Sequence, residues 1–280
     1  MEHTILNNDL ICPLVGIGTF MLSPKDAENS VREALKMGYR LIDTANAYVN
    51  ERAVGRGMRD SGVKREEIFL STKLWPSEYE NANAVDETLE CLGVEYVDLL
   101  YIHQPAGNWL AGYRMLEKAY REGKAKSIGI SNFEGKYIAE LETKWEIVPQ
   151  FIQVEAHPYF TQSELRRTLD KYGIRLMAWY PLGHGDKSLI NEPVFASLAE
   201  KYGKSNAQVI LRWHMQMGFV VIPGSKNVAH IRDNADIFDF TLTDDEMAQI
   251  AELDRCERYY NRTDAQLAGF AAWRPAYEKA

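Results

Sequence analysis

Gly38-Tyr39-Arg40-Leu41-Ile42-Asp43-Thr44-Ala45-Asn46-Ala47-Tyr48-Val49-Asn50-Glu51 joins a short apolar run to a carboxylate and then, five residues later, to a phenol. Two later apolar runs, residues 68–73 and 97–103, also end in a polar side chain. In a parallel barrel the carboxyl ends of the strands meet at one rim. If these runs are neighbouring strands, four polar side chains come together at that rim: Asp43, Tyr48, Lys73 and His103.

Eight short apolar runs predict β-strands along the chain. They are Val15–Thr19, Arg40–Asp43, Ile68–Lys73, Val97–His103, Ala125–Ser131, Phe151–Glu155, Arg175–Trp179 and Phe219–Ile222. Their spacing matches the roughly 30 residues of a βαβ unit, apart from a longer interval before the last run. Two consecutive helices, residues 195–202 and 205–216, account for that interval.

Helical signals lie between the strands. Residues 29–37 predict a helix that ends at Gly38, and capping boxes of the form S/T-x-x-E/Q begin at Thr161, Ser205 and Thr243. No linker or change of composition divides the chain. The sequence therefore predicts an α/β fold, a single (β/α)₈ TIM barrel domain over residues 1–280 with extra helices near the C-terminus, rather than two doubly wound domains.

The two ends of the chain add to the barrel. Residues 4–6 and 10–12 flank Asn7-Asn8-Asp9 and predict a β-hairpin, which we expect to plug the bottom of the barrel. Residues 259–280 contain several aromatic side chains, and we expect this tail to fold over the upper rim.

Composition excludes several classes of protein. The net charge of −8 argues against nucleic acid as a partner, because phosphate binding needs a basic face. The chain has neither a long apolar stretch for a membrane span nor a basic start typical of a secretory signal. Cys12, Cys91 and Cys256 are scattered and lack metal-ligand spacing, so we expect no metal site and a cytoplasmic location.

The four rim residues predict reduction of a carbonyl group. Each has an ordinary explanation alone, such as a helix cap for Asp43 or a core histidine for His103, but their joint occurrence favours a functional site. A tyrosine has a pKa of about 10, and we expect the Lys73 ammonium, held by Asp43, to lower the pKa of Tyr48. His103 can hydrogen-bond a carbonyl oxygen and orient it toward Tyr48, or it can assist the proton transfer. Because no nucleophile is evident, the hydride must come from a nicotinamide cofactor.

The motifs around these residues resemble the aldo-keto reductase family, in particular the small bacterial enzymes similar to diketogluconate reductases. The matching segments include residues 16–20, 38–51, 71–75, 101–105, 128–133, 153–159, 179–183 and 222–225. The resemblance implies a monomeric NAD(P)H-dependent reductase of aldehydes and ketones, with diketo sugars and aromatic or aliphatic aldehydes as possible substrates.

The resemblance also implies the roles of individual residues. Tyr48 is the proton donor, Trp179 stacks on the nicotinamide ring, and Asp43 reaches the ribose. The carboxamide-binding residues are Ser131, Asn132 and Gln153. The substrate-binding residues are Phe20, Tyr48, Trp75, His103 and Gln104. The remaining cofactor-binding residues are Gly18, Thr19, Leu182, Ser225, Lys226, Asn227, His230 and Asn234.

Two positions depart from the family pattern where a 2′-phosphate is expected. Gly224 stands in place of a lysine, and His230 in place of an arginine. Loss of two cations weakens the electrostatic preference for NADPH, although Lys226 remains. We expect NADPH to be favoured, with NADH as an alternative or second cofactor.

Two other interpretations remain open. A nicotinamide-binding regulatory or interaction subunit could keep this fold with little turnover, but it would have no need of the Tyr48–Lys73 pair. A flavin- or metal-dependent barrel is disfavoured because no metal-ligand cluster is evident. Turnover of an aromatic aldehyde separates an enzyme from a regulatory subunit.

Overall fold

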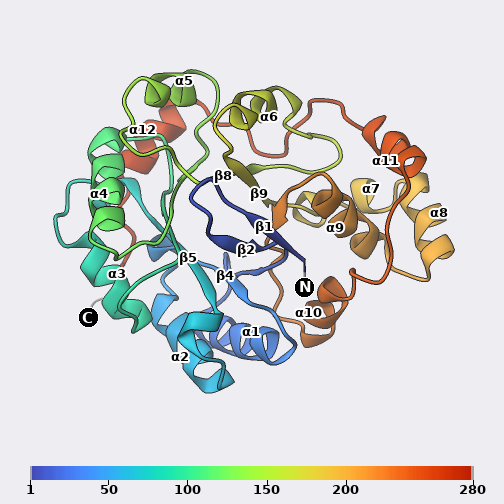
Figure 1. The fold of residues 1–280 in the computed structure, drawn as a ribbon, viewed down its shortest axis with the longest axis horizontal. Coiled ribbons are helices and arrows are strands. Elements are labelled where there is room, and N and C mark those ends of the chain that lie inside the picture. The colour runs from blue at the N-terminus through green and yellow to red at the C-terminus, as the bar shows by residue number, and fades with distance from the viewer. Residues whose placement is uncertain (1, 279–280) are drawn as a thin grey trace.

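Eight parallel strands form one curled sheet within residues 2–278, which are the residues that this computed structural model describes (Figure 1). In sheet order from β3 to β10 the strands are Ile17–Gly18, Leu41–Asp43, Phe69–Leu74, Leu99–Ile102, Ile128–Ser131, Phe151–Glu155, Arg175–Trp179 and Val220–Val221. The first and last strands meet, because the Gly16 N–H donates to the Val221 carbonyl (2.8 Å) and the Val221 N–H to the Leu14 carbonyl (2.9 Å). The predicted (β/α)₈ barrel is confirmed.

Helices surround the sheet (Figure 1). The α-helices are α1 (Pro24–Lys36), α2 (Glu51–Ser61), α3 (Ala84–Leu92), α4 (Trp109–Arg121), α5 (Lys136–Glu142), α6 (Ser163–Asp170), α7 (Lys187–Ile190), α8 (Pro193–Tyr202), α9 (Asn206–Gln216), α10 (Val228–Ala235), α11 (Asp244–Ala251) and α12 (Asp264–Ala272). Short 3₁₀ turns are η1 (Asn46–Tyr48), η2 (Arg65–Glu67), η3 (Pro76–Glu78) and η4 (Gly183–Gly185). None of the helices described is long and apolar enough to cross a membrane.

Helix starts agree with the sequence only in part. Ser205 and Thr243 begin complete capping boxes, as predicted. The box predicted at Thr161 is wrong: α6 begins at Ser163, and Gln162 precedes it with a φ of +57°. The Thr161 hydroxyl instead donates to the distant carboxylate of Asp254. A tertiary contact has taken the capping group, which local sequence could not reveal.

The N-terminal hairpin closes the amino end of the barrel, as predicted. Strands β1 (His3–Ile5) and β2 (Ile11–Pro13) are antiparallel. The Asn7 side-chain amide donates to the Pro149 and Tyr172 carbonyls, each at 3.1 Å, and Asn8 donates to the Lys126 carbonyl at 3.0 Å. These carbonyls precede β8, β9 and β7, so the hairpin turn is fixed at the amino ends of three strands.

The described part of the aromatic tail folds over the opposite rim, also as predicted. Helix α12 lies beside the start of α5, where the Lys136 ammonium is 3.5 Å from the Asp264 carboxylate (Figure 1). The Trp75 indole N–H donates to the Phe270 carbonyl at 3.1 Å, and the Trp75 ring packs edge-on against both Phe270 and Trp273. Residues from the end of the chain therefore help to enclose the carboxyl ends of the strands.

Candidate active site

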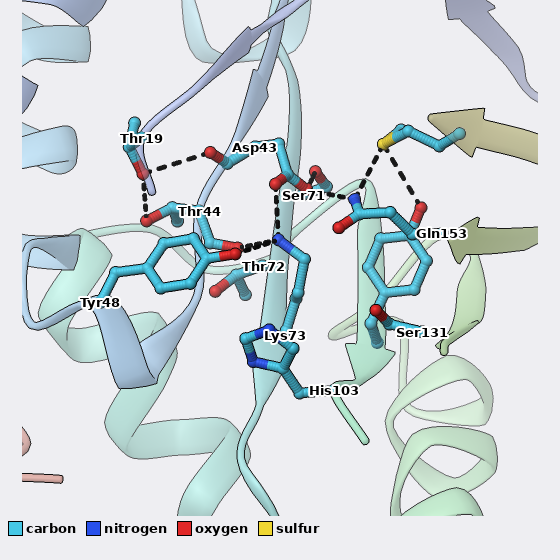
Figure 2. Close-up of polar contacts among 12 residues, drawn as sticks. Thr19, Asp43, Thr44, Tyr48, Ser71, Thr72, Lys73, His103, Ser131 and Gln153 are labelled. Atoms are coloured by element: carbon cyan, nitrogen blue, oxygen red, sulfur yellow. Dashed lines mark hydrogen bonds and ion pairs between the residues drawn. The ribbon is translucent and has the colours of Figure 1, made fainter. Parts of the chain in front are cut away.

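Lys73 is fully buried, and its ammonium lies among the rim residues drawn in Figure 2. The Lys73 ammonium lies 2.5 Å from an Asp43 carboxylate oxygen, 2.8 Å from the Thr44 carbonyl and 3.4 Å from the Tyr48 hydroxyl. An ammonium has three hydrogens to donate, and it meets three oxygens here. Burial of the charge is tolerated because it is paired with a carboxylate and hydrogen-bonded.

The Asp43 carboxylate is fixed on its other side as well. Its Oδ1 atom accepts from the Ser71 hydroxyl at 2.7 Å and from the Gln153 amide at 3.0 Å. Ser71 and Lys73 are two residues apart on β5, and side chains at that spacing lie on the same face of a strand. The Asp43 carboxylate, at the end of β4, thus accepts from neutral donors on β5 and β8 and from the charged ammonium on β5.

Tyr48 and His103 face the same space. Tyr48 ends the η1 turn, and its hydroxyl points toward the Lys73 ammonium in Figure 2. Its ring centroid lies 5.6 Å from that of His103, with the planes at 73°. Trp75 packs edge-on against His103 at 5.0 Å. The structure thus brings together all four residues that were predicted to meet.

The pKa of Tyr48 differs from the prediction. Burial, together with the nearby Asp43 carboxylate, raises the pKa of the Tyr48 phenol well above its ordinary value. The expectation of a Tyr48 pKa below its ordinary value is therefore wrong, because loss of solvation and the Asp43 carboxylate both disfavour the phenolate. Burial also lowers the pKa of Lys73, against the opposing effect of Asp43. Burial and Lys73 together lower the pKa of His103 well below its usual range.

The residues predicted to bind the nicotinamide converge on Asn132. Its Nδ2 atom donates to the His103 carbonyl and to the Ser131 hydroxyl, each at 3.1 Å, and its Oδ1 atom accepts from the Trp179 indole at 3.1 Å. Asn132 has a φ of +66°, a left-handed conformation that asparagine tolerates better than most residues. Gln153, on the neighbouring strand, is paired in register with Ser131.

The predicted substrate residues lie around Tyr48 and His103. The Phe20 ring is 51% exposed and lies 5.1 Å from the Tyr48 ring. Trp75 is buried between His103 and the tail aromatics. The buried Gln104 amide oxygen accepts from Arg262 at 3.3 Å. One exposed and one buried aromatic side chain thus flank the space in front of the phenol.

The outer cofactor residues predicted from the sequence differ in how exposed their side chains are. Ser225, Lys226, Asn227 and His230 lie at the start of α10, where Asn227 caps the helix by accepting from the Ala229 N–H. The side chains of Lys226 and His230 are exposed, Leu182 is half-buried and Asn234 is buried. The Thr19 hydroxyl is buried and lies 2.9 Å from the Thr44 hydroxyl, so it faces the protein interior.

Gly18 and Gly224 approach each other closely. A Cβ atom at Gly224 would lie 2.9 Å from the Gly18 carbonyl oxygen, and a Cβ atom at Gly18 would lie 2.8 Å from the Ile222 carbonyl oxygen. Such contacts are closer than real Cβ atoms show, so the backbone would have to shift. Glycine at position 224 therefore has a steric reason in this chain.

Sequence reasoning missed several residues that shape the site. Ser71 precedes Lys73 by two positions, so strand periodicity could have identified it. Arg262 donates to the Asn132 carbonyl at 2.8 Å, and Tyr260 packs near Trp179, with ring centroids 6.1 Å apart. These two tail residues are far from the strands in sequence and follow no periodic pattern that would place them.

Comparisons with known proteins agree with this arrangement. The model of the aldo/keto reductase family matches residues 14–255. Glyoxal reductase of Bacillus subtilis (strain 168) is 44% identical over 258 residues, covering 90% of this chain and 93% of that protein. The crystal structure of an aldo/keto reductase from Brucella melitensis is 43% identical, with a TM-score of 0.86 and coverage of 90% and 99% of the two chains.

A third relative was solved with a cofactor. The crystal structure of a Bombyx mori aldo-keto reductase in complex with NADP is 32% identical to this chain. It has a TM-score of 0.88 and covers 95% of this chain and 96% of its own. With the barrel, the four rim residues and these matches, the chain belongs to the aldo/keto reductase family and is an NAD(P)H-dependent carbonyl reductase.

Proposed function

We propose that Tyr48 protonates the oxygen of an aldehyde or ketone during its reduction to an alcohol. The observation that carries this proposal is the chain of contacts from the Asp43 carboxylate through the Lys73 ammonium to the Tyr48 hydroxyl. When bound, the nicotinamide cofactor supplies the hydride to the carbonyl carbon. The electron pair of the C=O π bond moves to oxygen, which takes the phenolic proton.

The raised pKa of Tyr48 keeps the phenol protonated at neutral pH, so the donor carries its proton before the substrate arrives. An alkoxide is a stronger base than a phenolate, and proton transfer to it is favourable. Lys73 then stabilises the phenolate that remains, while Asp43 and the Thr44 carbonyl hold the ammonium in place. Solvent returns the proton to Tyr48 for the next turnover.

His103 orients the carbonyl in this proposal. Its lowered pKa makes the imidazole neutral at physiological pH, so one ring nitrogen carries a hydrogen to donate and the ring brings no charge to the substrate. The Asn132 amide fixes the main chain of His103 by donating to its carbonyl. A neutral donor suits a carbonyl oxygen that becomes negative only during the reaction.

Ser131, Asn132, Gln153 and Trp179 fit the nicotinamide. Asp43 accepts from Gln153 Nε2, so the Oε1 atom of Gln153 is left as the acceptor for the cofactor's carboxamide N–H. Asp43 would hold the cofactor's ribose, and the residues at the start of α10 would hold its adenosine end. We propose NADPH as the favoured cofactor, with NADH as an alternative, because Lys226 is exposed beside Ser225 and Asn227.

The flanking aromatic side chains, Phe20 and Trp75, favour substrates with an apolar or aromatic body, although small dicarbonyls and diketo sugars belong to the same proposal. The similarity to glyoxal reductase supports testing dicarbonyls first. We propose that the protein acts as a monomer, because its own tail completes the site. Three free cysteines are compatible with the proposed cytoplasmic location.

Tyr48→Phe tests the proton donor. We expect the kcat for an aromatic aldehyde to fall about 10²–10⁴-fold, the usual contribution of general acid catalysis, while NADPH affinity stays unchanged. Tyr113→Phe is the matched control, since this buried hydroxyl donates to the Ile147 carbonyl away from the site. A Tyr48→Phe enzyme with most of its turnover would refute the assignment. A wild type without aldehyde turnover would favour the regulatory alternative.

A further inference from the structure

A buried carboxylate beside the site has no part in the proposed chemistry. Glu155 is the last residue of β8 and is 1% exposed. One of its oxygens accepts from the Tyr259 main-chain N–H at 2.5 Å and the other from the Tyr260 N–H at 3.2 Å. His157 Nε2 lies 3.0 Å from the first oxygen. Because a buried carboxylate is costly without hydrogen bonds, these contacts fix the tail where it crosses β8.

Residues 259–262, the first two of which make this contact, form what we call the anchored segment. Its far end is Arg262, which donates to the Asn132 carbonyl at 2.8 Å and to the Gln104 side chain at 3.3 Å. Tyr260 packs near the Trp179 ring. The anchored segment therefore contacts two residues proposed to bind the nicotinamide and one proposed to bind the substrate.

The anchored segment directly precedes the N-cap of α12. Thr263 and Gln266 form a capping box at the start of this helix. From there, Phe270 and Trp273 reach the Trp75 side chain. A shift at residues 259–262 would thus move the start of the helix that encloses Trp75.

We propose that Glu155 is a positioning residue for carbonyl reduction. It holds the amides of Tyr259 and Tyr260, and through the anchored segment it fixes Gln104 and Trp75 in the substrate pocket. This inference rests on the proposed function. The Glu155 side chain touches none of the four rim residues. Replacement of Glu155 should therefore weaken substrate binding more than it slows the chemical step, so the effect should be seen in KM rather than in kcat.

Glu155→Gln tests the proposal with little change of shape. The amide oxygen can still accept one N–H, but the NH₂ group cannot accept the other, so one of the two main-chain amides is released. We expect faster hydrogen–deuterium exchange in residues 259–262 and a KM for 4-nitrobenzaldehyde raised about tenfold, equivalent to about 1.4 kcal/mol of binding. The kcat should change less than about threefold.

Glu192→Gln is the matched control. This carboxylate binds Arg255 at 2.9 Å and the Tyr159 hydroxyl at 2.5 Å, so it holds the tail before the anchored segment. Its replacement should leave the exchange at 259–262 and the KM unchanged. Arg262→Met disturbs the same segment from its other end and should raise KM as Glu155→Gln does, which keeps the test valid if Glu155→Gln fails to fold.

Two results would overturn the positioning role. One is unchanged exchange in residues 259–262 of Glu155→Gln. The other is an unchanged KM in folded Glu155→Gln or, if that variant does not fold, in Arg262→Met. If the wild type reduces aldehydes, either result contradicts the positioning role of Glu155 and leaves the proposed function intact. A wild type that reduces no aldehyde contradicts the proposed function itself.

Discussion

Replacement of Glu51 by glutamine should change how the stability of this protein depends on pH. Glu51 begins α2, is 3% exposed and accepts a hydrogen bond from the Thr72 hydroxyl at 2.5 Å. Burial raises the pKa of its carboxyl from 4.5 to about 8, and the nearby Glu278 carboxylate adds to this, while Thr72 and Lys73 oppose it. The folded protein therefore keeps a proton on Glu51 at neutral pH, whereas the unfolded chain does not.

The sign of the effect follows from the proton count. Between about pH 4.5 and pH 8 the folded state binds one proton more than the unfolded state, so the free energy of unfolding falls as pH rises. One proton corresponds to about 1.4 kcal/mol per pH unit. From pH 5.5 to pH 7.5 the contribution of Glu51 thus falls by about 3 kcal/mol. Glutamine has no proton to lose, and its side-chain oxygen can still accept from Thr72.

Urea unfolding at pH 5.5, 6.5, 7.5 and 8.5 measures this contribution as the difference between wild type and Glu51→Gln. All other titrating groups contribute equally to both proteins, so they cancel in the difference. Relative to the variant, the free energy of unfolding of the wild type should fall steadily up to about pH 8. Above that pH the difference should level off, because Glu51 is then ionised in both the folded and the unfolded state. The exposed Glu87→Gln variant is the control and should run parallel to wild type. Parallel curves for Glu51→Gln would mean that Glu51 is ionised in the folded protein, and would refute the reasoning.

Four further substitutions test the charges at the site and the cofactor preference. Lys73→Met should abolish turnover and cost about 3–5 kcal/mol in urea unfolding, because it leaves the Asp43 carboxylate buried without its partner. Adding Asp43→Asn should restore part of the stability but none of the activity, and a double variant no more stable than the single one would contradict this explanation. His230→Arg should raise the ratio of kcat/KM for NADPH to that for NADH about tenfold. Gly224→Lys should lower stability without a comparable gain, because its Cβ atom meets the Gly18 carbonyl; a Gly224→Lys variant with wild-type stability would show that the backbone yields there.

The parts of the fold that depend on local pattern could be predicted from the sequence. Strand runs, their spacing and the polar residues at their ends placed Asp43, Lys73 and His103 at the carboxyl ends of neighbouring strands of one barrel. The contacts that could not be predicted join residues far apart in the chain. Thr161 has the sequence of a helix cap, yet it binds Asp254. Arg262 reaches Asn132 across 130 positions, and no periodicity relates the two.

Gly224 shows a similar limit for cofactor preference. From the sequence alone, a glycine in place of a lysine is a lost charge, and restoring the lysine is the direct test of its effect. In the fold, the same glycine faces the Gly18 carbonyl across the seam where the first and last strands meet. The residue at position 224 is thus subject to a packing requirement that the sequence pattern does not express, and His230, on the exposed surface of α10, is the cleaner position for a charge change.

The pKa of Tyr48 follows from the same opposition between local and global effects. The sequence identifies a lysine near a tyrosine, and this pair alone predicts an acidic phenol. Packing in the barrel removes water from both groups and adds the Asp43 carboxylate, which disfavours a phenolate. The ammonium therefore cannot make Tyr48 acidic in the resting protein. In the proposed reaction, its contribution comes when the carbonyl oxygen takes the proton, because only then is there a phenolate for Lys73 to stabilise.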